Sequence, residues 1–561
     1  MSEEKMDYGK TLNLPETSFP MRASLPEKEP QIQKEVFDNG LYEKILKKNE
    51  GHESFVLHDG PPYANGEIHA GHALNKILKD TIVRYKALRG YYSPYIPGYD
   101  THGMPTEKKA IEKLGLDRSK IPVTKFRDTC KEFTSNYKKL QTEGFKRLGV
   151  LGDWEHPYVT YDTKMEARQI GVFGDMYKKG YIYKGLKPVY WCTDCETALA
   201  EAEIEYKDIA GSSIYVKFPV KDAKGKFDSK NTFIVIWTTT PWTLPGNLAI
   251  TLGEEYDYSI VEANGEKYII ASELVEKVMG IAEIKEYKKV QKLKGKELEG
   301  VLCKHPFLDR DSVVIMGSED TVNVELTEGT GAVHTAPGYG KEDYLAGQKY
   351  NLGIVVTVDA KGHQTEGAGP FAGMYYAKSN KEITKWLEEN GYLLKETQIS
   401  HSYPHCWRCK KPIIFRATPQ WFASVDGFRD DVLKAIKTVT WHPDWGEDRM
   451  SEMIKGRNDW CISRQRTWGV PLPIFYCKDC EEPYVTEESI KKIQDIFREK
   501  GSNAWYDLPE EELMPEGAKC AKCGCTHFKK ETDIMDVWFD SGSTHQSVLV
   551  ERGLPYPADL Y

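Results

Sequence analysis

Apolar residues recur at helical spacing in the first part of the chain. They begin after His69 and continue at Ala73, Ile77, Ile82 with Val83, and Leu88, which predicts a long helix that follows a loop over residues 59–67. Similar spacing predicts helices over about 107–115 and 126–148.

Short apolar runs alternate with these predicted helices. Phe55–Leu57 and the proline-rich segment that ends at Asp100 have the character of strands. Strands that alternate with helices favour a parallel sheet, so the fold class predicted here is α/β.

The pattern changes near residue 186. Runs of β-branched residues such as "SSIYVKFPV" and "TFIVIWTTT" are separated by glycine turns, which predicts a β-rich region up to about residue 400. Helices are expected within it near 271–279 and 379–390. We therefore expect a β-rich insertion that interrupts the α/β domain.

These patterns predict four parts of the chain. They are an N-terminal extension over residues 1–45, the first half of the α/β domain over 46–190, the β-rich insertion over 191–400 and the second, incomplete part over 401–561. The last part includes a zinc-binding element at about 470–530.

Composition narrows the class of protein. The 561 residues are 40% hydrophobic and 29% charged, which is typical of a globular protein with a large core. A net charge of -9 argues against a simple nucleic-acid coat, although local basic patches remain compatible with it. No apolar run reaches the about 20 residues of a membrane helix, and "MSEEKMDYGK" lacks the layout of a signal peptide. We expect a cytoplasmic protein without a membrane anchor, and a monomer.

Nine of the twelve cysteines fall in clusters. Clusters of this kind in a reducing compartment indicate metal sites. "WCTDC" and "HCWRC" stand at the two ends of the β-rich region, so one zinc ion could join Cys192, Cys195, Cys406 and Cys409. A second set would be Cys477, Cys480, Cys520 and Cys523, with Cys525 as an alternative ligand. The sequence thus predicts one or two structural zinc sites, against the alternative of inert thiols in turns.

The loop before the first long helix has the features of an anion site. Free backbone N–H groups and the helix dipole favour a phosphate there. His69 and His72 are three residues apart, so we expect both imidazoles on one helix face, where they could stabilise developing charge. Gly71 would allow close approach to the backbone. The alternative is two surface histidines. The basic residues of this helix are predicted to form a solvated face: Lys76, Lys79, Arg84, Lys86 and Arg89.

Three longer motifs extend this interpretation. "PPYANGEIHAGHALNK", "PGYDTHGMPTE" and "DVWFDSGSTH" resemble, in order, signature segments of the class I aminoacyl-tRNA synthetases, and within them the isoleucyl subgroup. The resemblance implies that the α/β part is a Rossmann-like nucleotide-binding domain. It also implies ATP-dependent activation of isoleucine, with Mg²⁺, and its transfer to tRNA(Ile). It implies ATP binding by His69, Gly71, His72 and Asn65, with both histidines catalytic. It also implies an isoleucine pocket formed by Pro61, Asp100 and Trp538, in which Asp100 would bind the substrate ammonium.

An isoleucine pocket needs a second site that removes errors. A hydrophobic pocket rejects an amino acid one methylene smaller by only about 10- to 200-fold; isoleucine against valine is the standard example of this limit. "WTTTPWTLPGN" and "GTGAVHTAPGYGKEDY" resemble the two editing motifs of the family. The resemblance implies hydrolysis of mischarged valyl-tRNA(Ile) by six residues: Thr238, Thr239, Thr240, Thr243, His334 and Asp343.

The chain also departs from the family. The Lys-Met-Ser-Lys-Ser signature is absent, so we expect an N-terminal fragment in which activation is impaired. "SRQRTWG" resembles a family segment that lies near the tRNA acceptor stem. The alternatives are a valyl-type synthetase, or a zinc-bearing tRNA-binding and editing module that does not activate an amino acid.

Overall fold

The structure is a computed structural model in which residues 7–20, 22–115 and 120–561 are described. Residues 1–6 and 21 of the predicted N-terminal extension lie outside the described residues. The chain divides into two compact units. The first contains Met1–Arg168 and Asp540–Tyr561, and the second contains Gln169–Phe539.

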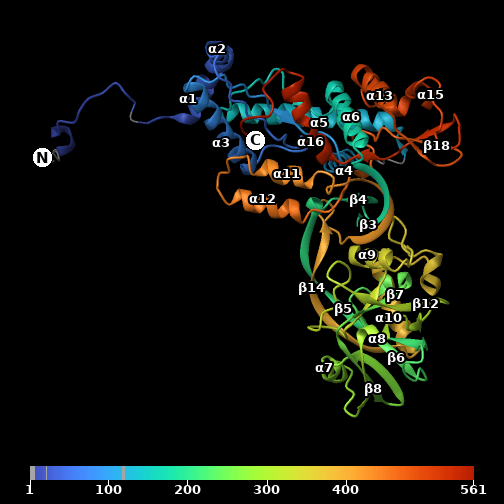
Figure 1. Ribbon diagram of the computed structural model, residues 1–561. Coiled ribbons are helices and arrows are strands. Elements are labelled where there is room, and N and C mark those ends of the chain that lie inside the picture. The colour runs from blue at the N-terminus through green and yellow to red at the C-terminus, as the bar shows by residue number, and fades with distance from the viewer. Residues whose placement is uncertain (1–6, 21, 116–119) are drawn as a thin grey trace. The chain divides into compact units, whose positions relative to one another are not determined.

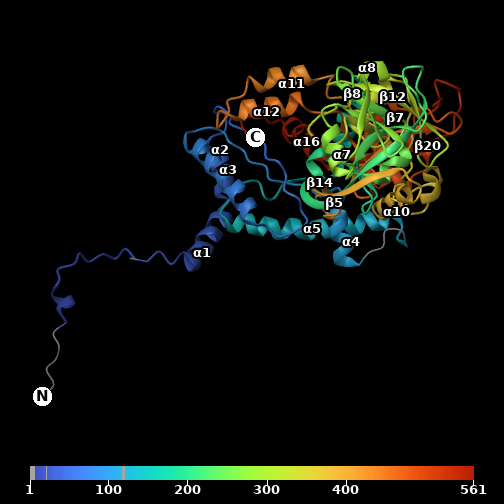
Figure 2. The ribbon, with the colours of Figure 1, turned by 90° about the horizontal axis from the view of Figure 1, so that it is seen from below.

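Helices supply most of the regular structure of the first unit. Their bounds are α1 Leu25–Asp38, α2 Leu41–Lys48, α3 Ala70–Leu88, α4 Met104–Leu114 and α5 Val123–Arg147. The three helices predicted after His69 and over about 107–115 and 126–148 are α3, α4 and α5, and Figure 2 shows α5 as the longest of them, with α4 beside it. Helix α6 spans Thr163–Lys178 and α16 spans Val537–His545.

The strands of the first unit are parallel but very short. β1 Gly98–Tyr99 pairs in parallel with β2 Tyr158–Val159. The predicted strand Phe55–Leu57 contributes only isolated parallel bridges, one of them between Leu57 and Tyr95. Pro94 and Pro97 interrupt the predicted strand that ends at Asp100, and proline lacks the N–H group that a longer ladder needs. The predicted α/β class is confirmed, with less regular strand than the pattern indicated.

Two helices of the predicted extension were not expected from its polar composition. Tyr42 of α2 is buried. Its hydroxyl accepts a hydrogen bond from Tyr95 N at 2.9 Å and donates one to Tyr95 O at 3.2 Å. This part of the chain is therefore attached to the core of the first unit.

The second unit contains a ten-stranded sheet in the order β10-β8-β9-β6-β13-β7-β12-β11-β5-β14. Because β5 also pairs with β6, six of these strands close into a ring. The bounds are β5 Ile204–Asp222, β6 Thr232–Thr238, β7 Ala249–Gly253, β8 Asp257–Ala263, β9 Glu266–Ala271, β10 Lys288–Lys294, β11 Leu302–Lys304, β12 Asp311–Gly317, β13 Ala332–Thr335 and β14 Leu393–Cys406. The β-rich prediction for this region is confirmed.

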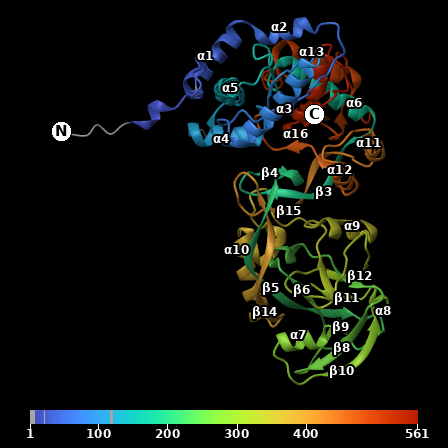
Figure 3. The same cartoon turned by 90° about the vertical axis from the view of Figure 1, so that its left-hand side faces the viewer.

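Helices accompany this sheet. They are α7 Val275–Ile281, α8 Gly295–Leu298, α9 Lys341–Lys349 and α10 Tyr376–Glu389. Figure 3 shows α10 alongside β14, and α7 and α10 correspond to the two helices predicted in this region. The core of this part consists of apolar side chains between Ile214 and Leu387.

Two antiparallel ribbons connect this sheet to the rest of the second unit (Figure 1). One pairs β5 with β14, and the other pairs β3 Ile182–Cys192 with β15 Ile414–Ala423. β4 Thr197–Leu199 and β16 Trp460–Cys461 complete the second sheet. The chain thus leaves and returns on neighbouring strands, as predicted for an insertion.

The remaining elements of the second unit are short. They are α11 Arg429–Ile436, α12 Gly446–Lys455, β17 Ser463–Arg464, β18 Phe475–Cys477, β19 Pro483–Tyr484, α13 Glu487–Lys500, α14 Ala504–Asp507, α15 Glu510–Leu513, β20 Phe528–Lys530 and β21 Ile534–Met535.

Candidate functional site

The two histidines of the opening motif lie at the N-terminus of α3. His69 is the N-cap residue rather than part of the helix, and its ring stacks on that of His72 with centroids 3.8 Å apart. A Cβ atom at Gly71 would lie 3.1 Å from the His69 ring, so the glycine leaves room for this ring. The predicted proximity of the imidazoles is therefore present, through stacking instead of a shared helix face.

The hydrogen bonds of this pair leave one donor on each ring. His69 Nδ1 accepts from His72 N at 3.3 Å, and His72 Nδ1 accepts from His69 N at 3.4 Å. A neutral imidazole that accepts at Nδ1 carries its proton on Nε2. Burial, aided by His69 and Lys76, lowers the pKa of His72. Both rings can thus donate an Nε2–H group to an anionic oxygen beside a helix N-terminus.

The loop before α3 is held from several sides. Gln141, which is fully buried, donates to Tyr63 O at 2.9 Å and Gly66 O at 2.8 Å. Within the described residues, the buried side-chain nitrogen of Asn65 has no hydrogen-bond partner. An amide donor in this position fits a ligand that supplies the acceptor.

The prediction that the basic residues of α3 form a solvated face is wrong for Lys76, whereas Arg89 is exposed. Lys76 is 3% exposed and bonds to the buried carboxylate of Asp59, which also accepts from Lys79 at 2.6 Å. Lys86 Nζ lies 4.3 Å from the ring centroid of Phe55. Lysine can bury its alkyl chain when a carboxylate meets its ammonium group, and here the pair attaches the loop to the helix.

Asp100 lies at the carboxyl end of β1 and is 3% exposed. Its backbone N–H donates to Pro62 O at 2.8 Å, and its carbonyl accepts from Ala64 N at 2.7 Å. The structure therefore joins the loop that contains Pro61 directly to Asp100. Trp538 belongs to the second unit, at the start of α16, and its side chain is 39% exposed.

The two threonine- and glycine-rich motifs of the β-rich region converge on one cavity of about 350 Å³. All six residues predicted for editing line this cavity: Thr238, Thr239, Thr240, Thr243, His334 and Asp343. They come from the end of β6, the turn after it, β13 and α9. We call this space the threonine cavity.

A chain of hydrogen bonds fixes one wall of the threonine cavity. Asn247 Nδ2 donates to His334 Nδ1 at 2.8 Å, so the ring carries its proton on Nε2 and donates to Thr243 Oγ1 at 3.0 Å. Thr243 Oγ1 in turn donates to Thr240 O at 2.8 Å. Burial lowers the pKa of His334 to about 3, so this ring is neutral at physiological pH and acts as a fixed donor.

The threonines differ in what their hydroxyl groups contact. Thr238 Oγ1 accepts from Thr240 N at 3.1 Å. In the described part of the chain, the Thr239 hydroxyl makes no hydrogen bond to protein. Thr239 is therefore the threonine best able to bond a ligand or a water molecule.

Asp343 places a carboxylate at the opposite wall. It lies in the first turn of α9, and its Oδ2 accepts from Ala336 N at 2.7 Å. Burial raises the pKa of Asp343 to about 7. A carboxylate that is costly to ionise alone gains from an ammonium partner, which suits a substrate with a free amino group.

Sequence reasoning missed several residues of this cavity. Trp237, Glu325 and Glu328 also line it, and Asn247 sets the His334 tautomer. Gly331 has φ of +76°, and a Cβ atom there would lie 2.3 Å from the Ala271 side chain. Asn247 is the last residue of the motif "WTTTPWTLPGN". Its place in the same motif as the threonines could have identified it as a residue of the cavity.

The structure brings together both predicted sets of four cysteines. They are Cys192, Cys195, Cys406 and Cys409, and Cys477, Cys480, Cys520 and Cys523. The sulfur atoms of Cys192 and Cys409 are 3.5 Å apart, and those of Cys477 and Cys523 are 3.4 Å apart. Tetrahedral zinc with Zn–S bonds of about 2.3 Å requires S–S separations of about 3.8 Å. Both sets therefore fit a zinc ion, and Cys525 lies outside the second set.

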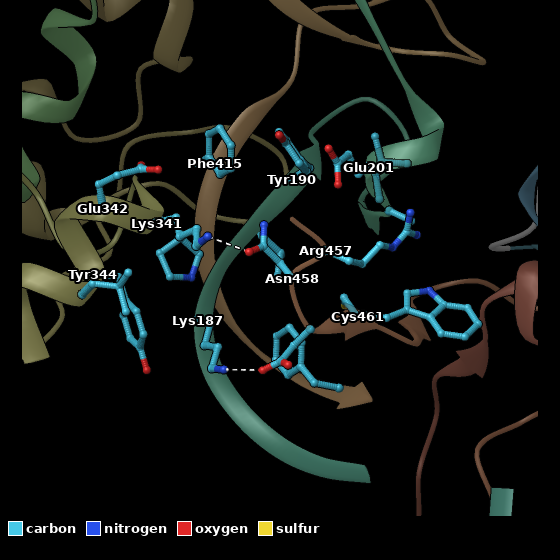
Figure 4. Close-up of a pocket in the computed structure, with 18 of the residues that line it drawn as sticks. Lys187, Tyr190, Glu201, Lys341, Glu342, Tyr344, Phe415, Arg457, Asn458 and Cys461 are labelled. Carbon is cyan, nitrogen blue, oxygen red and sulfur yellow. Dashed lines mark hydrogen bonds and ion pairs between the residues drawn. The ribbon is translucent and has the colours of Figure 1, made fainter. Parts of the chain in front are cut away.

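A second cavity of about 480 Å³ is lined by residues of α9 and of the β3–β15 ribbon (Figure 4). Lys341 crosses its edge and donates to Asn458 Oδ1 at 2.6 Å, while Lys187 pairs with Asp459 at 3.1 Å. Trp460 also lines this cavity. Helix α9 thus contributes to the threonine cavity and to a mixed-charge space beside the β3–β15 ribbon.

Within the described residues, no helix has both the length and the apolar character needed to cross a membrane.

Comparisons with known proteins agree with these features. Residues 31–561 match the family described as "tRNA synthetases class I (I, L, M and V)". The isoleucine--tRNA ligase of Caldicellulosiruptor bescii is 58% identical over 99% of this chain and 61% of its own length. That of Moorella thermoacetica is 56% identical over 99% of this chain and 60% of its own length. The chain thus spans about three fifths of the length of these relatives.

One solved structure, the ternary complex of Agrobacterium radiobacter K84 agnB2 LeuRS-tRNA-LeuAMS, aligns with 92% of this chain and 59% of its own. The identity is 18% and the TM-score is 0.39. The match of the family over residues 31–561 shows that the chain belongs to the class I tRNA synthetases of the I, L, M and V group.

Proposed function

We propose that the protein is an isoleucine--tRNA ligase that activates isoleucine with ATP and Mg²⁺, transfers it to tRNA(Ile) and hydrolyses mischarged valyl-tRNA(Ile). The observation that carries this proposal is the convergence of all six predicted editing residues on the threonine cavity. The names of the relatives above support isoleucine as the amino acid.

In the activation step, His69 and His72 would donate from Nε2 to phosphate oxygens of ATP. The charge that develops on these oxygens in the transition state would then meet donors already held in place by mutual hydrogen bonds and stacking. The buried nitrogen of Asn65 would supply a further donor to the nucleotide. Asp100 would bind the ammonium group of isoleucine, and Pro61 and Trp538 would contact its side chain.

In the editing step, Asp343 would bind the ammonium group of the valyl ester. Thr239, with its available hydroxyl, would orient the terminal adenosine or the attacking water, while Thr238, Thr240 and the His334–Thr243 pair keep the wall in place. Water would attack the ester carbonyl, and the valine carboxylate and the 3′-terminal hydroxyl of tRNA would be released. Among these residues, none forms a nucleophile–base pair, which suits positioned water.

The two sets of four cysteines would each hold a structural zinc ion. Metal ligation by cysteine thiolates fits a reducing compartment, and we place the protein in the cytoplasm.

The full-length protein tests the proposal in two assays. ATP–pyrophosphate exchange should depend on isoleucine and run faster with isoleucine than with valine, and valyl-tRNA(Ile) should be deacylated faster than isoleucyl-tRNA(Ile). A preference for valine in exchange would assign the valyl type instead. Deacylation at the spontaneous rate would exclude an editing function for the threonine cavity.

A further inference from the structure

The first arginine of the segment "SRQRTWG", Arg464, is buried inside the protein and is not exposed to a binding partner. Arg464 is 4% exposed. Its NH2 donates to Glu203 Oε2 at 3.0 Å and to Asp536 Oδ2 at 2.8 Å. Its NH1 donates to the carbonyls of Cys461 and Ser463 at 2.8 and 2.9 Å. The Arg464 side chain is therefore bonded within the protein, and the expectation that this segment lies near a tRNA acceptor stem stays a prediction.

Asp536, the acidic partner of Arg464, fixes two tryptophans. Its Oδ2 also accepts from Trp460 Nε1 at 2.8 Å, and its Oδ1 accepts from the backbone N–H of Trp538 at 3.2 Å. The second contact places a carboxylate at the start of α16, where it satisfies a helix N-terminal donor. The orientation of Asp536 therefore determines how the first turn of α16, with Trp538, is held.

Glu203, the other partner, belongs to the root of the β-rich insertion. Its Oε2 accepts from Ala200 N at 2.7 Å, at the end of β4, and its carbonyl accepts from Trp407 N at 3.0 Å. Trp407 lies between Cys406 and Cys409. Arg464 thus joins the base of the insertion to the start of α16 through buried charges.

One guanidinium faces two carboxylates in this site, and all three groups are buried. Without the cation, Asp536 and Glu203 would be unpaired anions in a low-dielectric environment, so one would take up a proton or turn away. Turning of Asp536 would release the backbone of Trp538. A positive charge at position 464 therefore holds both carboxylates in place only if one of its nitrogens donates to both of them.

We propose that Arg464 is a positioning residue for amino-acid selection, which holds Trp538 in the isoleucine pocket through Asp536. This inference rests on the proposed function, because Trp538 is assigned to that pocket by resemblance. Arg464 does not touch substrate; it acts by fixing the carboxylate that holds Trp538.

The test uses Arg464→Lys in the full-length protein. Lysine keeps the charge but lacks the planar fork that serves both carboxylates and two carbonyls. We expect KM for isoleucine to rise on the order of tenfold, KM for ATP to stay unchanged, and the preference for isoleucine over valine to fall. Asp536→Asn keeps an oxygen for Trp538 but cannot accept from Arg464 on its nitrogen, so it should act in the same direction.

Two comparisons separate positioning from general destabilisation. Arg429→Lys is the matched control, because Arg429 donates to backbone carbonyls of residues 454, 455 and 457; it should leave both KM values unchanged. Glu203→Gln removes only the other arm of the ion triad, and should lower the unfolding midpoint with less effect on KM for isoleucine.

Each outcome decides the inference. Equal changes in KM for isoleucine and ATP, or no change in either, would overturn it while leaving the proposed function intact. Unfolding of both Arg464→Lys and Asp536→Asn would assign a structural role only, and would also overturn it. A wild-type protein without isoleucine-dependent exchange would overturn the proposed function, and this inference with it.

Discussion

The four threonines predicted for editing have different environments. The hydroxyl of Thr243 is held between His334 and the Thr240 carbonyl, whereas that of Thr239 has no hydrogen-bond partner within the described part of the chain. Removing a hydroxyl that bonds to buried partners leaves them unsatisfied, at a cost of about 1–3 kcal/mol. Removing one that faces an open cavity does not.

This difference predicts that two valine substitutions affect different properties, stability in one case and activity in the other. Thr243→Val should lower the stability of the β-rich part by about 1–3 kcal/mol, while Thr239→Val should leave stability unchanged and slow valyl-tRNA(Ile) deacylation. Urea unfolding and single-turnover deacylation measure the two effects. Equal loss of stability in both variants would show that Thr239 has a structural role.

The proposed role of Asp343 predicts that editing depends on pH. Burial raises its pKa to about 7, and binding of an ammonium group requires the ionised form. We expect kcat/KM for deacylation, corrected for spontaneous hydrolysis, to rise as the pH increases through about 7, because this parameter reports the free enzyme. His334 adds no titration in this range, since its pKa is about 3.

Asp343→Asn is the control for this profile. It should lose the rise through about 7 together with most of the activity. Folding stability should change in the opposite direction to activity as the pH rises. Between about pH 4 and pH 7 the folded carboxyl of Asp343 binds more protons than the unfolded one. The free energy of unfolding of the wild-type protein should therefore decrease, relative to that of the variant, as the pH rises over that range. A variant that keeps the pH profile would assign the titration to another group.

At the scale of elements, the Asp59–Lys76 pair attaches the histidine loop to α3. Burial alone would raise the pKa of Asp59, but Lys76 and Lys79 outweigh it and the pKa is below its usual value. A depressed carboxyl pKa stabilises the fold above the unfolded value near 3.8, and this stabilisation is lost as the pH falls through the folded pKa. The attachment should therefore persist to about pH 4 and weaken below it.

Breaking this pair should be costly at any pH above that range. Asp59→Asn would leave Lys76 as a buried cation without its carboxylate, at a cost of about 3 kcal/mol. Faster hydrogen exchange in α3 would report the loss. Lys34→Met is the matched control, because the Lys34–Asp38 pair is exposed and should contribute under about 1 kcal/mol. Similar exchange in the two variants would contradict the structural role of Asp59.

The cysteine sets predict two zinc ions for each chain. Cys409→Ser should reduce the zinc content by one and loosen the β3–β15 and β5–β14 ribbons, which the first set joins. Cys523→Ser should also remove one zinc ion, whereas Cys525→Ser should retain both. Elemental analysis of the purified proteins gives the counts. Loss of zinc from Cys525→Ser would make Cys525 the ligand that the sequence left as an alternative.

The sequence predicted elements better than it predicted contacts. Helical spacing located α3, α4 and α5, and motif order located both cysteine sets and the threonine cavity. It could not predict the burial of Lys76 or Arg464, because charged residues in amphipathic patterns are usually exposed. Their burial depends on Asp59, Glu203 and Asp536, which approach from distant parts of the chain. The stacking of His69 on His72 was likewise not predicted. Helical spacing alone would place both residues on the helix, but His69 is the N-cap residue and precedes it.

At the scale of the whole molecule, the β-rich insertion has the composition of a separate module. The buried apolar side chains of its main core lie between Ile214 and Leu387. The chain enters and leaves this region on paired strands, next to the first cysteine set. A region that has its own core, and whose two ends are joined by a zinc ion, should fold alone.

This predicts the behaviour of an excised fragment from β3 to β15, residues 182–423. It should unfold cooperatively, bind one zinc ion and deacylate valyl-tRNA(Ile) more slowly than the full-length protein, since it lacks other contacts to the tRNA. The same fragment with Asp343→Asn should fold at least as stably near pH 7 but be inactive. A fragment that folds and binds zinc, yet hydrolyses valyl-tRNA(Ile) only at the spontaneous rate of the Asp343→Asn control, would mean that the threonine cavity needs the rest of the protein to bind its substrate. The β-rich part would then be a structural module whose chemistry depends on tRNA being held elsewhere.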